Sequence, residues 1–276
     1  LLVAFQTKNI KPALVAMLLI GTGIGLEMFY KPDQNKDGKT SVALWQPAIP
    51  QHIKWKTKHR PEILASHLND GLPPQTSLII WPETALPMTE KQMRKELPDL
   101  DSLLMNNGQT LISGILGESN GRFTNRLVSL GIGSGTYDKT RLVPFGEYVP
   151  LEYFLRGLME FFNLPMSQII PGQESELLLH KDLKIAPLIC YEIAFTGLAR
   201  QNSAHANVLL TVSNDTWFGT SIGPDQHLEI AQIRARELGK PIMRATNDGV
   251  TALIDPFGRI TQQLDRYNRR ILYGNI

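Results

Sequence analysis

The sequence of 276 residues contains only one cysteine, Cys190. A single cysteine excludes an internal disulfide framework and any zinc site built from several thiolates. The six histidines show no HExxH or comparable ligand spacing, so we expect neither a metal site nor another cofactor. Charge is nearly balanced, with 28 basic and 26 acidic residues and no basic run, which argues against binding to nucleic acid. Cys190 is left with two possible roles, packing or chemistry.

The longest apolar stretch lies near the N-terminus, from Pro12 to Tyr30. Its length matches a helix that spans a bilayer, and Lys8 and Lys11 precede it, as the positive-inside tendency places basic residues on the cytoplasmic side. We therefore expect residues 1–30 to form a membrane helix, the end of a truncated transmembrane bundle, with the remaining chain on the non-cytoplasmic face. A buried core helix and a signal peptide are the alternatives, although no A-x-A-like cleavage site follows.

A polar segment containing proline and glycine, residues 31–39, separates this stretch from the first strand-like run. The chain starts at Leu1 without an initiator methionine and stops directly after a strand-like run, so we expect a fragment of a longer protein. Residues 40–276 alternate short apolar runs with helical patterns, which indicates an α/β sandwich. The helical patterns lie near residues 52–69, 90–106, 192–204 and 226–239.

Three polar residues each follow a buried strand-like run, which is where open α/β sheets place their ligands. They are Glu83 in IIWPETALP, Lys139 in YDKTRLVP and Cys190 in APLICYE. Taken singly, they can be explained as a helix-capping carboxylate, a solvated lysine and an inert cysteine. Together they supply what acyl chemistry needs, because a thiol requires a base and a developing oxyanion requires positive charge. No Cys–His pairing stands out, which favours Glu83 as the base.

The motifs WPETALP, DKTRLVPFGEYVP, LICYE and SNDTWFG resemble the nitrilase, or carbon–nitrogen hydrolase, superfamily, and within it the apolipoprotein N-acyltransferase family. The order Glu, Lys, Cys is the same, and residues 223–260 are similar to that family's closing helix and strands. The resemblance covers nearly all of residues 41–274. It implies a nitrilase-like α-β-β-α sandwich in residues 40–276, preceded by one transmembrane helix.

The resemblance also implies a reaction. Glu83 would be the general base, Lys139 would stabilise the tetrahedral intermediate, and Cys190 would accept the acyl group, with the N–H of Tyr191 completing an oxyanion hole. A fatty acyl chain would pass from a phospholipid, through a thioester, to the α-amine of an S-diacylglyceryl-cysteine apolipoprotein. The implied setting is the lipid bilayer of a Gram-negative inner membrane, with the catalytic domain facing the periplasm.

Four supporting residues follow from the same resemblance. Glu147 would support the catalytic lysine, Tyr191 and Glu192 would flank the nucleophile, and Trp55 would lie near a lipid entrance. Residues 150–165 are rich in aromatic and aliphatic side chains and could form either a core helix or an arm at the membrane surface. Two rival functions stay open: an amidase that hydrolyses a small C–N bond with the same three residues, and a catalytically silent membrane scaffold.

Overall fold

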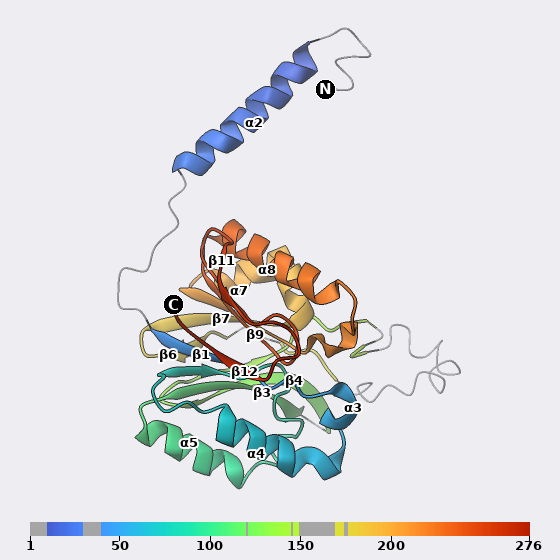
Figure 1. Ribbon diagram of the computed structural model, residues 1–276, viewed down its shortest axis with the longest axis vertical. Helices are drawn as coiled ribbons and strands as arrows, with labels where there is room; N and C mark the ends of the chain where they lie inside the picture. The colour runs from blue at the N-terminus through green and yellow to red at the C-terminus, as the bar shows by residue number, and fades with distance from the viewer. Residues whose placement is uncertain (1–9, 30–39, 120, 145, 149–168, 174–175) are drawn as a thin grey trace, which may run out of the picture. The chain divides into compact units, whose positions relative to one another are not determined.

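The computed structural model describes residues 10–29, 40–119, 121–144, 146–148, 169–173 and 176–276. It divides into two compact units, Leu1–Gln34 and Asn35–Ile276. The first contains the helix α2 (Lys11–Phe29) (Figure 1). Among the described helices none is long and apolar enough to cross a membrane, so the membrane helix predicted over residues 1–30 is not confirmed. The predicted linker and the aromatic segment at 150–165 lie outside the described residues.

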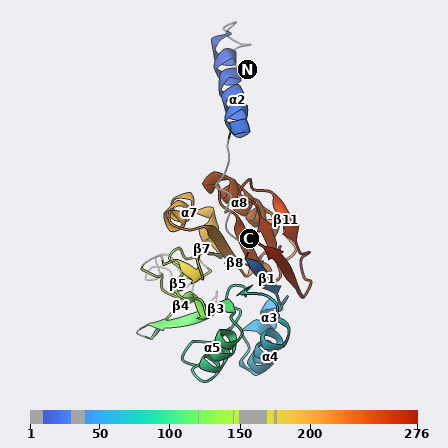
Figure 2. The ribbon, with the colours of Figure 1, turned by 90° about the vertical axis from the view of Figure 1, so that its left-hand side faces the viewer.

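Two six-stranded sheets form the centre of the second unit (Figure 2). The first sheet contains, in spatial order, β12 (Arg270–Asn275), β1 (Ser41–Gln46), β2 (Leu78–Ile80), β3 (Thr110–Ser119), β4 (Arg122–Gly131) and β5 (Thr136–Asp138). The second contains β11 (Ile260–Gln263), β10 (Ala252–Ile254), β9 (Ile242–Thr246), β8 (Val208–Ser213), β7 (Leu183–Ile189) and β6 (Leu178–His180). In each sheet three central strands are parallel, β1–β2–β3 and β7–β8–β9, and the flanking strands pair antiparallel.

Helices cover the outer face of each sheet (Figures 1 and 2). The first sheet carries α4 (Arg60–Asp70) and α5 (Glu96–Asn106), and the second carries α7 (Thr196–Ser203) and α8 (Gly223–Leu238). Shorter helical turns are α3 (Gln51–Lys54), η1 (Thr57–His59), η3 (Cys190–Ala194) and η4 (Asp215–Phe218). The predicted α-β-β-α sandwich is therefore confirmed for the described part of the second unit.

Central strands are apolar on both faces because each face meets a different core. On β2, Leu78 and Ile80 pack between the sheets, whereas Ile79 packs beneath the helices. On β8, Leu210 faces the core between the sheets and Leu209 faces the helices. Successive side chains of a strand point to opposite faces, so a strand covered on both sides reads as a continuous apolar run.

The helix predicted near residues 52–69 is interrupted in the structure. α3 ends at Lys54, and α4 starts only at Arg60, with Pro61 in its first turn. Proline suits the first turn of a helix because the amide hydrogen that it lacks has no partner inside the helix there. The break leaves Lys54 and Trp55 at the end of a short turn rather than within a long helix.

Two adjacent leucines on α5 test the assignment of its faces. Leu104 is 1% exposed in the core against the first sheet, and Leu103 is 50% exposed. Leu104→Ala is expected to lower the free energy of unfolding by about 2–5 kcal/mol, because it removes buried methyl groups and leaves a cavity. Leu103→Ala is expected to change it by about 0.5 kcal/mol or less. Urea unfolding followed by circular dichroism measures both, and equal losses would contradict the assigned faces.

Candidate active site

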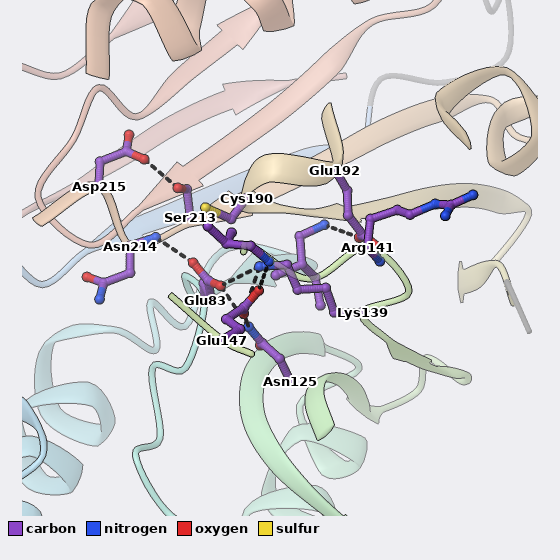
Figure 3. A network of polar contacts seen from close by, with 12 residues as sticks. Glu83, Asn125, Lys139, Arg141, Glu147, Cys190, Glu192, Ser213, Asn214 and Asp215 are labelled. Carbon is purple, nitrogen blue, oxygen red and sulfur yellow. Dashed lines mark hydrogen bonds and ion pairs between the residues drawn. The ribbon is translucent and has the colours of Figure 1, made fainter. Parts of the chain in front are cut away.

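Strand ends from both sheets bring the three predicted reactive residues together. Glu83 follows β2, Lys139 follows β5, and Cys190 follows β7 directly. β5 runs in the same direction as β2, so Glu83 and Lys139 leave the first sheet at the same end. Figure 3 shows their side chains converging with that of Cys190. Each of these residues is more than fifty positions from the next in the sequence, and the fold brings them close together in space.

The turn that carries Glu83 packs directly against the backbone of β3. A Cβ atom on Gly114 would lie 2.3 Å from the amide nitrogen of Thr84 and 2.5 Å from the carbonyl oxygen of Pro82. The N–H of Leu86 donates to the Gly114 carbonyl at 3.0 Å. Thr84 also has a φ of 45°, a left-handed conformation uncommon for residues other than glycine. The position of Glu83 therefore depends on glycine at 114 and on a strained turn.

The Glu83 carboxylate is 7% exposed and accepts hydrogen bonds from two sides. The Asn125 side-chain amide donates to Oε1 at 2.7 Å, and the Asn214 backbone N–H donates to Oε2 at 2.8 Å. The Lys139 ammonium lies 3.5 Å from Oε1. These three contacts fix the orientation of the Glu83 carboxylate.

Lys139 is 1% exposed, and its ammonium donates to Oε1 of Glu147 at 2.8 Å. Glu147 is oriented in turn by the Val143 N–H, which donates to its Oε2 at 2.8 Å. Burial alone would lower the pKa of Lys139, but the negative charges of Glu83 and Glu147 outweigh it and hold that pKa above its usual range. Lys139 therefore stays a cation, and Glu147 contacts it as the resemblance implied.

Cys190 begins the η3 turn with a φ of 53°, so the nucleophile candidate lies in a left-handed, strained conformation. Burial raises the pKa of its thiol to about 12; the charge of Glu83 acts in the same direction, and Lys139 opposes it. The thiol is therefore protonated at neutral pH. Because the thiolate is the reactive form of cysteine, this site requires a base at the moment of attack.

Glu192 connects the two strand ends that carry Lys139 and Cys190. It is fully buried; its Oε1 accepts from the Thr140 N–H at 2.7 Å, and its Oε2 accepts from the Ile189 N–H at 2.8 Å. The Tyr137 hydroxyl donates to the same carboxylate at 2.9 Å. Glu192 thus fixes the spacing between Lys139 and Cys190 through the backbone next to each of them. It does not touch a reacting atom.

The structure keeps the side chains of the other two predicted residues out of the polar network. Tyr191 is 41% exposed, and its ring contacts Phe195 edge to face at 4.9 Å. Trp55 follows α3, and its indole N–H has no hydrogen-bond partner within the described part of the chain. The backbone N–H of Tyr191 is different, because it lies in the first turn of η3, where a helix leaves its own donors without partners.

Sequence reasoning assigned no role to two polar residues that contact Glu83. Asn125 bridges both carboxylates, since its amide also donates to Glu147 at 3.2 Å. Lys54 is 1% exposed, and its ammonium donates to the Glu83 carbonyl at 3.1 Å. Burial lowers the pKa of Lys54 to about 8, against the opposing charges of Glu83 and Asp248. No sequence signal marks Asn125, because its neighbours Thr124 and Arg126 are also polar; Lys54 resembles any surface lysine in the sequence.

No metal site accompanies this network in the described residues, where no three His, Cys, Asp or Glu side chains form a group that could hold a metal ion. The arrangement instead combines a thiol, a carboxylate that can take its proton and a fixed cation. Those are the elements of nucleophilic acyl chemistry through a covalent intermediate.

Comparison with known families relates the geometry to function. Residues 41–276 match the model of the carbon–nitrogen hydrolase family. A relative named apolipoprotein N-acyltransferase from Pseudomonas syringae pv. tomato is 47% identical, over 85% of this chain and 48% of its own length. A relative of the same name from Photobacterium profundum is 38% identical, over 98% of this chain and 54% of its own. The chain thus spans about half the length of the curated relatives it matches.

Solved structures share the fold at low sequence identity. A CN-hydrolase superfamily protein from Xanthomonas campestris superposes with a TM-score of 0.64 at 18% identity, covering 87% of this chain and 91% of that one. An amidase from Nesterenkonia sp. AN1, in a form with an acetamide group added covalently to its active-site cysteine, gives a TM-score of 0.60 at 16% identity, covering 87% and 91%. These likenesses support the two-sheet sandwich.

Alkylation of Cys190 by iodoacetamide tests the charge arrangement without any substrate. Because the pKa of the thiol is raised to about 12, we expect the rate to keep rising from about pH 7 to about pH 10 without a plateau. A plateau near neutral pH would contradict the arrangement.

Proposed function

The chain belongs to the carbon–nitrogen hydrolase family, and we propose that it carries the catalytic domain of an apolipoprotein N-acyltransferase. The observation that carries the proposal is the buried network of Glu83, Lys139 and Cys190, in a chain 38% to 47% identical to relatives of that name. The proposed reaction moves a fatty acyl chain from a phospholipid to the α-amine of an S-diacylglyceryl cysteine at the start of a lipoprotein.

In the first half-reaction Cys190 attacks the ester carbonyl of the phospholipid. Glu83 takes the thiol proton as the sulfur–carbon bond forms, since the thiol does not ionise by itself at neutral pH. The Lys139 ammonium and the Tyr191 N–H stabilise the oxyanion. The intermediate then expels the lysophospholipid oxygen, which receives the proton back from Glu83, and Cys190 is left as a thioester.

In the second half-reaction the lipoprotein α-amine attacks the thioester. Glu83, ionised again, accepts the proton that the amine loses, and the same two donors stabilise the second oxyanion. The carbon–sulfur bond breaks, the thiolate is reprotonated, and an amide is released. Lys139 keeps its proton throughout, because its pKa is held above the usual range, so its contribution is electrostatic.

The lipid substrates motivate a membrane setting as part of the same proposal. Residues 12–30 are almost wholly apolar, and the relatives are named for an apolipoprotein substrate. We propose that this segment contacts the bilayer of a Gram-negative inner membrane, with the catalytic domain facing the periplasm. The aromatic segment at residues 150–165 would reach the same membrane surface.

An amidase is the second candidate, favoured by the likeness of fold to the Nesterenkonia enzyme. The same thiol, base and cation would attack a small amide, and water would replace the lipoprotein amine. The two functions differ in the acyl donor and in the release of ammonia, so they can be separated by the products.

Intact-protein mass spectrometry after incubation of the full-length protein with phospholipid tests the proposal. We expect a mass increment of one fatty acyl chain that neutral hydroxylamine removes, because hydroxylamine cleaves a thioester. Cys190→Ser should abolish the hydroxylamine-sensitive increment, since it removes the only thiol in this chain.

The acceptor step completes that test. Addition of a diacylated lipopeptide with a free α-amine should discharge the acyl-enzyme and acylate the peptide, whereas an N-acetylated copy of the peptide should not. Absence of any acyl-enzyme, together with release of ammonia from small amides, would overturn the acyltransferase in favour of the amidase.

A further inference from the structure

A second buried charge cluster lies behind the nucleophile, outside the Glu83–Lys139 network. Its centre is Asp215, which is fully buried at the end of β8. The Arg244 guanidinium donates to Asp215 Oδ2 at 2.7 Å, and the Ser213 hydroxyl donates to Oδ1. His227 on α8 completes the cluster, with Nδ1 3.0 Å from Asp215 Oδ1. Gly249 packs so closely on Asp215 that a Cβ would lie 2.2 Å from Oδ2.

The His227 ring contacts an acceptor oxygen on each side. On its other side, Nε2 lies 3.1 Å from the backbone carbonyl oxygen of Cys190. Carbonyl and carboxylate oxygens accept hydrogen bonds, so both contacts form only when each ring nitrogen carries a proton. Burial alone would raise the pKa of Asp215, but Arg244 and His227, with the Ser213 hydroxyl, hold it well below its usual range. The ionised carboxylate therefore holds the ring through Nδ1.

The carbonyl that His227 contacts belongs to a peptide group used in the proposed chemistry. The C=O of Cys190 and the N–H of Tyr191 share one planar trans peptide, so they point in opposite directions. A hydrogen bond that fixes the carbonyl therefore also sets the direction of the N–H. The bond also polarises the peptide, which strengthens the N–H as a donor. Cys190 has a left-handed φ of 53°, which is an unfavourable conformation for a residue other than glycine. A hydrogen bond from outside the turn therefore helps to hold this peptide in place.

We propose that His227 is a positioning residue that aims the Tyr191 N–H at the oxyanion, with Asp215 and Arg244 holding the ring. The role rests on the proposed function, because it matters only if an acyl carbonyl is attacked at Cys190. His227 touches the backbone of the nucleophile and not the reacting carbonyl, so it acts through the peptide that it orients.

Two substitutions of His227 form a matched pair. His227→Gln places an amide N–H near the position of Nε2 and keeps a donor for the Cys190 carbonyl. His227→Asn places it near the position of Nδ1, keeps a donor for Asp215 and loses the contact with the carbonyl. Thermal unfolding and the rate of iodoacetamide alkylation serve as controls for folding and for access to the thiol, because alkylation forms no oxyanion.

The measured quantity is the rate at which a p-nitrophenyl fatty ester acylates Cys190 in the full chain, read by intact mass. We expect His227→Asn to slow acylation on the order of 10- to 100-fold, somewhat less than removal of an oxyanion donor itself. His227→Gln should stay within about threefold of the wild type, and alkylation should be equal in the two variants, because both replace the ring by a neutral amide. Equal acylation rates in the Asn variant and the wild type, or equal losses in the two variants, would overturn the proposal.

If the proposed function is wrong, the result is different: the wild-type chain itself would form no acyl-enzyme with the fatty ester or with phospholipid.

Nitrogen-edited NMR of the histidine-labelled resting protein tests the hydrogen bond between His227 and the Cys190 carbonyl without substrate. We expect two ring N–H signals that disappear in both variants. A ring nitrogen without a proton at neutral pH would overturn the inferred hydrogen bond.

Discussion

The buried ammonium of Lys139 lies between two carboxylates, and the rest of the site depends on it. It is 3.5 Å from Glu83 and 2.8 Å from Glu147, and all three residues are buried. Removal of one partner from such a group is costly, because the remaining charges stay buried without compensation. The Asn125 amide satisfies both carboxylates at once. The carboxylates and the ammonium are thus held in fixed positions.

This arrangement divides the chemical work among separate residues. Burial and the negative charge of Glu83 favour a neutral thiol at Cys190, against the opposing charge of Lys139, and the side chains of these three residues converge (Figure 3). The cation that attracts an oxyanion keeps its own proton. Covalent catalysis then begins from a protonated nucleophile, and proton transfer accompanies attack. In the proposed reaction, contacts with the substrates need to supply only orientation and the exclusion of water.

The sequence predicted the sandwich well, because central strands such as β2 and β8 are apolar on both faces and are followed by polar residues. Strands β5 and β6 have only three residues each and leave no periodic signal, and the helix near residues 52–69 is broken at Trp55. Their places at the ends of strand-like runs pointed to Glu83, Lys139 and Cys190, the resemblance implied their roles, and their convergence is seen in the structure (Figure 3). Lys54 and His227 were missed, since their partners, the carbonyls of Glu83 and Cys190, are backbone atoms that no side-chain pattern reveals.

The protonation state of the resting thiol is the most direct test of this account. This chain has one cysteine, so its infrared spectrum contains at most one S–H stretching band. Comparison of wild type with Cys190→Ser in the same buffer at neutral pH isolates that band. The account predicts an S–H band in the wild type that is absent from the variant. A wild-type protein without the band would contain a resting thiolate, which would contradict the role of Glu83 as the base that takes the thiol proton.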